Sequence, residues 1–356
     1  MRMNSKGFTL IEMLVVIALL AIIMIGLLNL LDTSSKISVV QTELADTQEN
    51  VRFAAYHVMR TARMMGSSAM PFAANSGGSD SWFAGELMSN VTGAATTPFG
   101  NVPVADGSDV LTLRGFFEIS PFFTDGTGVT GTSVTIRETN DAGFVINTNF
   151  DNVDHATLEG RGIFFMGMMD QAEYAIGQIA SGSTKDPDTD APNRQLVINF
   201  ATGSAQWSGL NPAGVTAPPA FDVYRVGIME SYTYYVAPDF TLQRLRADAS
   251  GASSEPVAVN IGSLQIELCV DANDDNQCDS WMSSPTVAQV AAGRIIGMRI
   301  TVFGRTGREV PDWVEPLTTF QTAAGATIAD INVNDLNRFA KWRRIEVAAA
   351  LRNYLF

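Results

Sequence analysis

Apolar and polar residues are distributed most unevenly at the amino end of the chain. Residues 1–7 form a short polar stretch that carries two charges, Arg2 and Lys6, whereas residues 8–31 form an apolar run whose only charge is Glu12. As a helix, this run would be about 36 Å long, which suffices to cross a hydrocarbon core of about 30 Å. Because positive charges stay on the cytoplasmic side, Arg2 and Lys6 predict a single-pass inner-membrane protein with a cytoplasmic amino terminus and an exported remainder.

The apolar run does not have the form of a cleaved secretory signal. Such a signal has an apolar stretch of about 7 to 15 residues, followed by a small-residue cleavage site. Here the run is longer, and residues 29–33 lead directly into a helical pattern. A plain membrane anchor would explain the hydropathy but not Glu12, since a carboxylate in hydrocarbon costs roughly 2.5 to 3.5 kcal/mol. We therefore interpret Glu12 as a functional residue that needs a positively charged partner.

The helical pattern continues beyond the apolar run, over residues 32–66. Apolar residues recur every seven positions in one row, and mostly small or polar residues form a second row. The first row holds Ile37, Leu44, Val51, Val58 and Met65, and the second holds Val40, Thr47, Ala54 and Thr61. Because the second row lacks bulky residues, this face suits packing on a sheet or beside other helices better than a free coiled coil. Gly66, which two serines follow, marks the end of the helix.

Residues 67–356 predict a globular domain built from strands. Up to about residue 190 the strand signals are weak and lie among many turn residues, at 110–113, 134–136 and 163–169. Later segments alternate apolar and polar residues with a period of two, at 196–200, 224–228, 232–236, 264–270, 296–302 and 345–351. This order of elements predicts an α+β fold in which one long amino-terminal helix packs on a mainly antiparallel sheet.

Residue types that catalysis commonly needs are sparse. The chain contains two histidines, His57 and His155, and two cysteines, which provide neither a metal-binding His cluster nor a Cys/His pair. A Gly-x-Ser-x-Gly elbow and the lysine of a phosphate-binding loop are also missing from the sequence. The net charge of −14 favours a surface that repels phosphate groups. We therefore expect neither an enzyme nor a nucleic-acid-binding protein.

An acidic loop near the second cysteine is the remaining candidate for a binding site. Positions one, three, five, seven and nine of a calcium-binding loop are occupied by Asp271, Asn273, Asp275, Gln277 and Asp279. Asn276 can adopt the left-handed turn that glycine usually supplies, but position twelve is Met282 and not Glu. Two interpretations stay open, a bound Ca²⁺ and a solvated acidic hairpin loop. Hard oxygen ligands, with no His or thiolate set, argue against zinc.

Cys269 and Cys278 flank this loop in a domain that we expect to be exported. In an oxidising setting two cysteines this close in sequence predict a disulfide, and free thiols are the alternative. By loop-closure entropy a ten-residue ring would contribute on the order of 2.5 to 3 kcal/mol. The bond would hold the ends of the acidic loop together whether or not a metal ion binds.

The segment Gly7-Phe8-Thr9-Leu10-Ile11-Glu12 resembles the class III prepilin signal of type IV pilins and pseudopilins. In that family a prepilin peptidase cuts after the glycine, the new amino-terminal phenylalanine is N-methylated, and the glutamate pairs with the amine of a neighbouring subunit. The resemblance thus implies cleavage after Gly7, methylation of Phe8 and an assembly role for the carboxylate of Glu12. It also implies a leader (1–7), a transmembrane and filament-core helix (8–31), an amphipathic continuation (32–66) and a β-rich domain (67–356).

Weaker similarities, at residues 232–244, 261–267 and 343–353, point to the PilW-type minor pilins. The apolar run also lacks the helix-kinking proline that major pilins usually carry. The resemblance implies a minor pilin that helps to initiate or cap a type IV pilus, with other minor and major pilins and the inner-membrane assembly platform as partners. After assembly it would lie in a pilus at the cell surface or in a periplasm-spanning filament. A J-type pseudopilin of type II secretion and a membrane-anchored, calcium-dependent adhesin or binding module are the alternatives.

Overall fold

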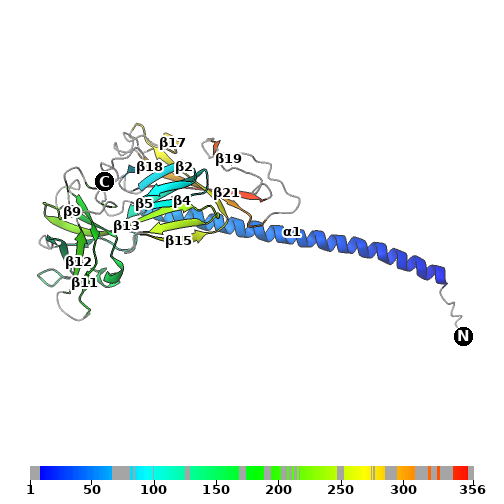
Figure 1. Cartoon of the computed structure of the whole chain (residues 1–356), viewed down its shortest axis with the longest axis horizontal. Helices are drawn as coiled ribbons and strands as arrows, with labels where there is room; N and C mark the ends of the chain where they lie inside the picture. The colour runs from blue at the N-terminus through cyan, green and yellow to red at the C-terminus, as the bar shows by residue number, and fades with distance from the viewer. Residues whose placement is uncertain are drawn as a thin grey trace.

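The structure is a computed structural model in which one long helix carries a β domain at its carboxyl-terminal part (Figure 1). It describes residues 9–65, 81–82, 85–98, 100–124, 129–167, 174–187, 194–201, 207, 211, 215, 217–246, 252–273, 275, 277–284, 295–308, 320–321, 327–328 and 340–351. The helix α1 comprises Leu10–Met64, 55 residues. Its amino-terminal part projects away from the β domain (Figure 1).

Thirteen of the described strands form one sheet, in which all pairings are antiparallel. Along the main path their order is β1-β2-β5-β13-β9-β10-β12-β8-β7, and β6, β11, β14 and β15 pair beside this path. Their bounds are β1 Ser81–Trp82, β2 Gly85–Val91, β5 Ser108–Gly115, β6 Phe122–Phe123, β7 Val129–Thr130, β8 Ser133–Arg137, β9 Gly162–Gly167, β10 Tyr174–Ile179, β11 Thr184–Lys185, β12 Gln195–Ala201, β13 Val223–Val236, β14 Leu242–Arg246 and β15 Ser253–Ala258.

A second antiparallel sheet has four described strands in the order β17-β16-β18-β21. Their bounds are β16 Ile261–Val270, β17 Ser280–Met282, β18 Ile295–Arg305 and β21 Trp342–Ala350. Smaller elements complete the described chain, namely the pair β3 Ala94–Thr97 and β4 Gly100–Pro103, the pair β19 Phe320–Gln321 and β20 Thr327–Ile328, and the 3-10 helices η1 Phe150–Asn152 and η2 His155–Thr157.

Tertiary packing covers only the carboxyl-terminal part of α1, which contacts β18 and β21 of the smaller sheet and β15 and β5 of the larger one. The buried residues of α1 are Thr47, Val51, Ala54, Ala55, Val58, Met59, Thr61 and Ala62. A Cβ atom at Gly304 of β18 would lie 2.1 Å from Cγ2 of Val51, so glycine is needed where the helix meets this strand. The two predicted rows are therefore confirmed from Thr47 onward, whereas Ile37 of the first row is 52 % exposed.

The two largest of the four buried hydrophobic clusters divide the described β domain into two lobes. The first core lies between α1 and both sheets and includes Val58, Tyr234 and Ile266. The second core contains no residue of α1 and includes Phe165 and Ile198. The strand β13 belongs to both lobes, because its first half pairs with β9 and its second half pairs with β5 and β14. We call the part built around the second core, with β6 to β12, the distal lobe, since it lies beyond the end of α1 (Figure 1).

A buried ion pair lies where the two lobes meet. Nη1 of Arg161 is 2.8 Å from Oε1 of Glu230 in β13, and both side chains are buried. The other carboxylate oxygen of Glu230 accepts hydrogen bonds from the backbone N–H groups of Phe117 and Glu118, over 2.7 and 3.1 Å. Burial raises the pKa of Glu230 to about 7, against the opposing effect of Arg161. Glu230 thus joins the segment after β5 to the middle of β13.

Side chains of β5 supply hydrogen-bond acceptors to β16 of the other sheet. Oδ2 of Asp109 accepts the backbone N–H of Ile266 over 2.7 Å, and Oγ of Ser108 accepts that of Leu264 over 3.1 Å. The second carboxylate oxygen of Asp109 accepts the N–H of Asn90 over 2.8 Å. Along this edge β16 pairs with β17 only at its last residues. The side chains of β5 therefore take the place of a neighbouring strand and connect the two sheets.

The predicted α+β class is confirmed, and the strands with period-two alternation are present. Two details differ from the simplest reading of the sequence. The runs at 224–228 and 232–236 are one strand, because Glu230, which interrupts the apolar positions, is buried with Arg161 as its counter-charge. The strands also divide between two sheets that share one core with α1. The predicted helix end at Gly66 lies outside the described residues, and α1 ends at Met64.

Candidate functional site

The described part of the chain begins with a helix cap formed by two residues. Thr9 has an extended backbone and is the N-cap of α1. Its hydroxyl donates to Oε2 of Glu12 over 2.8 Å, and its backbone N–H donates to the same oxygen over 2.9 Å. The backbone N–H of Glu12 in turn donates to Oγ1 of Thr9 over 3.4 Å. This reciprocal capping box turns the carboxylate of Glu12 toward the amino end of the helix.

Thr9 was not predicted as part of this site. The signal that identifies it is the Thr-x-x-Glu spacing directly before an apolar run, which is the sequence pattern of a capping box. Gly7 and Phe8 precede the described residues, so cleavage after Gly7 and methylation of Phe8 stay predictions. The cap nevertheless shows that the carboxylate of Glu12 lies beside the residue that directly follows Phe8 in the chain.

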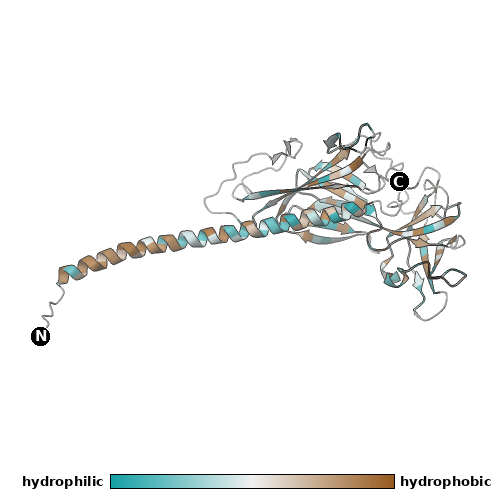
Figure 2. Cartoon of the chain, turned by 180° about the vertical axis from the view of Figure 1, so that it is seen from behind, coloured by the Kyte–Doolittle hydropathy of each residue, from teal (hydrophilic) through white to brown (hydrophobic). Residues whose placement is uncertain are grey.

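The segment from Leu10 to Leu31 exposes a continuous apolar surface. Every residue of this segment is exposed in the single chain, and Leu10 and Ile22 are 84 % and 67 % exposed. Figure 2 shows the segment as the hydrophobic part of the projecting helix. Among the described helices α1 is long and apolar enough to cross a membrane. Because soluble monomers rarely expose such large apolar patches, lipid or other chains must cover this surface.

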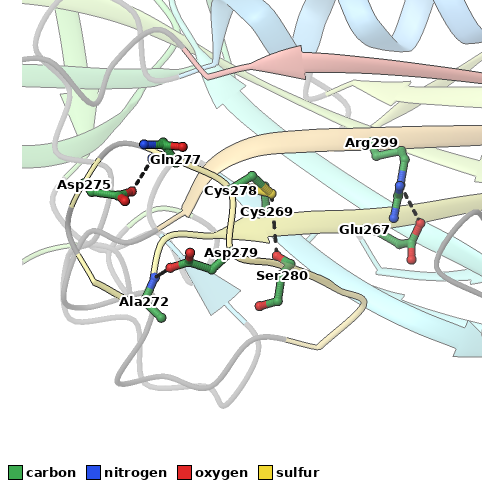
Figure 3. The surroundings of a disulfide bond; sticks show 9 residues. All are labelled: Glu267, Cys269, Ala272, Asp275, Gln277, Cys278, Asp279, Ser280 and Arg299. Carbon is green, nitrogen blue, oxygen red and sulfur yellow. Dashed lines mark hydrogen bonds and ion pairs between the residues drawn. A yellow bond between two sulfur atoms is a disulfide. The ribbon is translucent and has the colours of Figure 1, made fainter.

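The acidic loop is closed by the predicted disulfide. Cys269 near the end of β16 and Cys278 are bonded to each other, with their Cα atoms 5.6 Å apart (Figure 3). The disulfide prediction is therefore confirmed. The bond ties the two ends of the segment between β16 and β17 together.

Side chains of the acidic loop accept hydrogen bonds from the backbone of the loop itself. Oδ1 of Asp271 accepts the N–H groups of Asn273 and Asp275, over 3.2 and 3.3 Å. Oδ1 of Asp275 accepts the N–H of Gln277 over 2.8 Å, and Oδ2 of Asp279 accepts that of Ala272 over 2.7 Å (Figure 3). These bonds connect the carboxylates of Asp271, Asp275 and Asp279 to backbone N–H groups of the loop.

The turn does not by itself establish a metal site. Within the described residues no group of three or more His, Cys, Asp or Glu side chains is placed to hold a metal ion. Asp274 and Asn276 lie outside the described residues. Calcium binding by Asp271, Asn273, Asp275, Gln277 and Asp279 therefore stays a prediction.

The two histidines lie in separate packing environments. Nδ1 of His57 is 3.3 Å from the hydroxyl oxygen of Tyr234, which is also 2.9 Å from Oγ1 of Thr61. Burial lowers the pKa of His57, and the positive charges of Arg244 and Arg60 lower it further. His155 lies in the 3-10 helix η2 of the distal lobe. His57 therefore acts as a packing residue between α1 and β13.

Comparisons with known proteins match the amino-terminal segment. Residues 2–28 match the family model of the prokaryotic N-terminal methylation motif. No curated protein sequence matches the chain. Among solved structures, a type IV-like pilin from Thermus thermophilus is similar with 9 % identity over 56 % of this chain and 90 % of that chain, at a TM-score of 0.23. A score this low carries no argument, so the comparison with pilins rests on the motif and on the helix-and-sheet architecture.

Proposed function

We propose that this type IV pilin-like protein is a minor pilin that helps to initiate or cap the assembly of a type IV pilus. The observation that carries the proposal is the exposed apolar part of α1 with Glu12 in its first turn. This segment lies within the match to the prokaryotic N-terminal methylation motif. A plain anchor would need the apolar surface but not the carboxylate.

Assembly would transfer the apolar surface of α1 from contact with lipid to contact with other chains. Before assembly, lipid would cover residues 10–31 in the inner membrane, with the amino terminus on the cytoplasmic side. In a filament, the helices of neighbouring pilins would cover them instead. The carboxylate of Glu12 would then leave Thr9 and pair with the amino group of Phe8 on a neighbouring chain. Desolvation of both charges offsets part of this attraction, so many helix contacts must contribute to the stability of the assembly.

The size and shape of the β domain favour a minor over a major pilin. Residues 67–356 comprise 290 residues, and the distal lobe extends beyond the end of α1 (Figure 1). Every lateral neighbour in a thin filament would have to accommodate this bulk. If the subunit is used only a few times near a filament end, only its few neighbours at that end have to accommodate the bulk. The similarity to PilW-type chains at residues 232–244, 261–267 and 343–353 supports the same role.

The proposed partners follow from this role. A prepilin peptidase would process the chain after Gly7, and the inner-membrane assembly platform would then move it into a filament of other minor and major pilins. The mature protein would lie in a pilus at the cell surface or in a filament that spans the periplasm. We further propose that the disulfide-closed acidic loop binds calcium in the exported domain.

A J-type pseudopilin of type II secretion is the second candidate. The division of the described strands between two sheets around α1 favours it, since that family shares a two-sheet body. Deletion of the gene separates the two candidates, because loss of pili with intact protein secretion supports the minor pilin. Loss of secretion with intact pili supports the pseudopilin.

Intact-mass analysis tests the assignment to either filament class. Protein from cells that contain the prepilin peptidase should begin with N-methylated Phe8, and protein from peptidase-deficient cells should retain residues 1–7. Replacement of Gly7 by a bulky residue should give the unprocessed mass in both strains. A chain that retains residues 1–7 in cells that contain the peptidase would exclude both pilin-like functions and leave the membrane-anchored adhesin.

A further inference from the structure

An irregularity in β13 gathers three side chains on the distal lobe. The pairing of β13 with β9 shifts between Val223 and Arg225, so Tyr224 is an extra residue on β13. Such a bulge changes the direction of the side chains beside it. The rings of Tyr224 and Phe123 meet edge to face with centroids 5.8 Å apart, and Cζ of Arg225 lies 4.6 Å from the centroid of Phe123. We call Phe123, Tyr224 and Arg225 the arginine–aromatic cluster.

The guanidinium group of Arg225 has no counter-charge in the structure. Within the described part of the chain, this side chain forms neither an ion pair nor a hydrogen bond. Arg225 is half-buried, and Nε is its buried nitrogen without a partner, so Nη1 and Nη2 are the nitrogens that reach the surface. Buried arginines elsewhere in the sheets contact carboxylates, in the pairs Arg114–Glu86, Arg161–Glu230, Arg194–Asp151 and Arg299–Glu267. Arg225 therefore keeps an unused charge in an acidic protein.

Stacking on Phe123 orients this charge and leaves its donors available. A guanidinium group that lies over a ring uses its flat face, while its N–H groups point outward in the plane. Because Phe123 already holds the side chain, less conformational entropy is lost when a ligand binds. Tyr224 is 38 % exposed, and its hydroxyl forms no hydrogen bond within the residues that the structure describes. The cluster thus offers parallel N–H donors beside an aromatic surface, which fits a carboxylate next to an apolar group.

The surroundings of the cluster favour a protein carboxylate over other anions. The net charge of −14 repels phosphate groups that carry two charges, whereas a carboxylate carries one. A sugar acid would also need polar side chains that bind its hydroxyl groups. Thr124, which follows Phe123, is buried, and its hydroxyl donates to the carbonyl of Val223. Its hydroxyl is therefore already used, and the cluster fits an acidic peptide segment better than a polysaccharide or a nucleic acid.

We propose that the arginine–aromatic cluster binds a carboxylate side chain in an acidic segment of another protein. Nη1 and Nη2 of Arg225 donate to the two carboxylate oxygens, and the ring of Tyr224 contacts the apolar residue next to that carboxylate. The distal lobe lies beyond the end of α1, so the partner meets the protein away from the apolar segment (Figure 1). The inference goes beyond the proposed function, since it requires neither cleavage after Gly7 nor a filament.

Titration of the full-length protein in detergent micelles with a capped dipeptide, acetyl-Glu-Leu-amide, tests the proposal. The protein contains seven tyrosines, so selective isotope labelling gives few backbone amide signals, and Tyr224→Phe identifies that of Tyr224. This signal should move in a saturable way, with a dissociation constant on the order of 1 to 10 mM. Acetyl-Gln-Leu-amide, which lacks the charge, should bind at least about fivefold more weakly. Equal binding of the two peptides, or no movement at about 20 mM peptide, would overturn the proposal.

Variants of Arg225 separate the guanidinium fork from simple charge. Arg225→Gln should weaken binding of the glutamate peptide at least about fivefold, because both charge and fork are lost. Arg225→Lys keeps the charge and should still bind at least about threefold more weakly, since an ammonium group cannot bind both oxygens in parallel. Arg52→Gln, at an exposed arginine of α1, is the matched control and should bind like the wild type. Wild-type affinity of Arg225→Lys would overturn the proposed geometry, and this variant decides the question if Arg225→Gln does not fold.

Galacturonic acid and inorganic phosphate are the competing probes in the same titration. Both carry negative charge, but neither places a carboxylate beside an apolar side chain. The proposal expects each of them to bind more weakly than acetyl-Glu-Leu-amide. Tighter binding of galacturonic acid would overturn the proposal in favour of an acidic polysaccharide. Binding of phosphate as tight as that of the glutamate peptide would also overturn it, because attraction between opposite charges would then explain the effect.

Discussion

The hydroxyl of Thr9 lies 2.8 Å from Oε2 of Glu12, and the backbone N–H of Thr9 lies 2.9 Å from the same oxygen. The carboxylate that we assign to assembly thus already has two donors within its own chain. In hydrocarbon these donors reduce the cost of the carboxylate, since buried or lipid-facing polar groups are expensive without partners. Pairing with a neighbouring amine must therefore exchange existing hydrogen bonds for a charged contact.

Thr9→Val should loosen the first turn of α1. Valine lacks the hydroxyl that serves the cap, and loss of an N-cap side chain costs about 1 kcal/mol. Hydrogen exchange of the amides of Ile11 to Met13, measured in lipid bilayers, should become about fivefold faster. Thr9→Ser keeps the hydroxyl and should exchange at the wild-type rate. Equal rates for the valine and serine variants would show that the hydroxyl does not hold the helix start.

Glu12→Gln and Glu12→Val should separate the charge of Glu12 from its capping role. Glutamine can still form a capping box with Thr9, whereas valine cannot. If the carboxylate pairs with an amine, both variants should insert and be processed but enter filaments poorly, because both lack the negative charge. Co-purification with partner pilins and counts of pili measure this. Wild-type incorporation of Glu12→Gln would assign the residue to capping alone, and wild-type incorporation of Glu12→Val would refute any assembly role.

Asp109→Asn should reduce the pH dependence of stability. Burial raises the pKa of Asp109 to about 7 from an ordinary value of 3.8, although two backbone N–H groups act in the opposite direction. The folded state therefore binds this proton more tightly than the unfolded state. The resulting stability is fully present below about pH 4 and is lost as the pH rises through about 7, by up to about 4 kcal/mol.

Urea unfolding of a soluble fragment that starts near Ile37, followed from pH 4 to pH 8, measures this effect. The fragment keeps every buried position of α1, because these begin at Thr47. Glu230→Gln is the matched comparison, since the pKa of Glu230 is also raised to about 7. In each single variant the unfolding free energy should fall less between pH 4 and pH 8 than in the wild type. In the double variant it should fall least. Slopes identical to wild type in both single variants would contradict these raised pKa values.

Millimolar Ca²⁺ should raise the melting temperature of the same fragment if the acidic loop binds calcium. A cation would offset the negative charges of Asp271, Asp275 and Asp279, which lie within nine positions of the chain. Asp275→Ala should abolish the heat of binding and the shift in melting temperature. Asp239→Ala, in another exposed turn, is the control and should leave both unchanged. No heat and no shift in the wild type would leave the loop as a solvated acidic hairpin.

Several features of this protein were determined by sequence alone because they depend on residues close together in the chain. Spacing along one helix is enough to identify the apolar run, the position of Glu12 within it and the face of α1 that is buried. The disulfide between Cys269 and Cys278 closes a short ring, so the two thiols had little freedom to find other partners. Even the cap at Thr9 could have been read from its distance of three residues to Glu12.

Only the tertiary structure decided which strands pair and which charges are buried, because these depend on contacts between distant segments. Arg161 and Glu230 are 69 positions apart, and Asp109 and Ile266 are 157 positions apart. In the sequence, a buried carboxylate looks the same as a solvated one, since its counter-charge or donor is supplied by another strand.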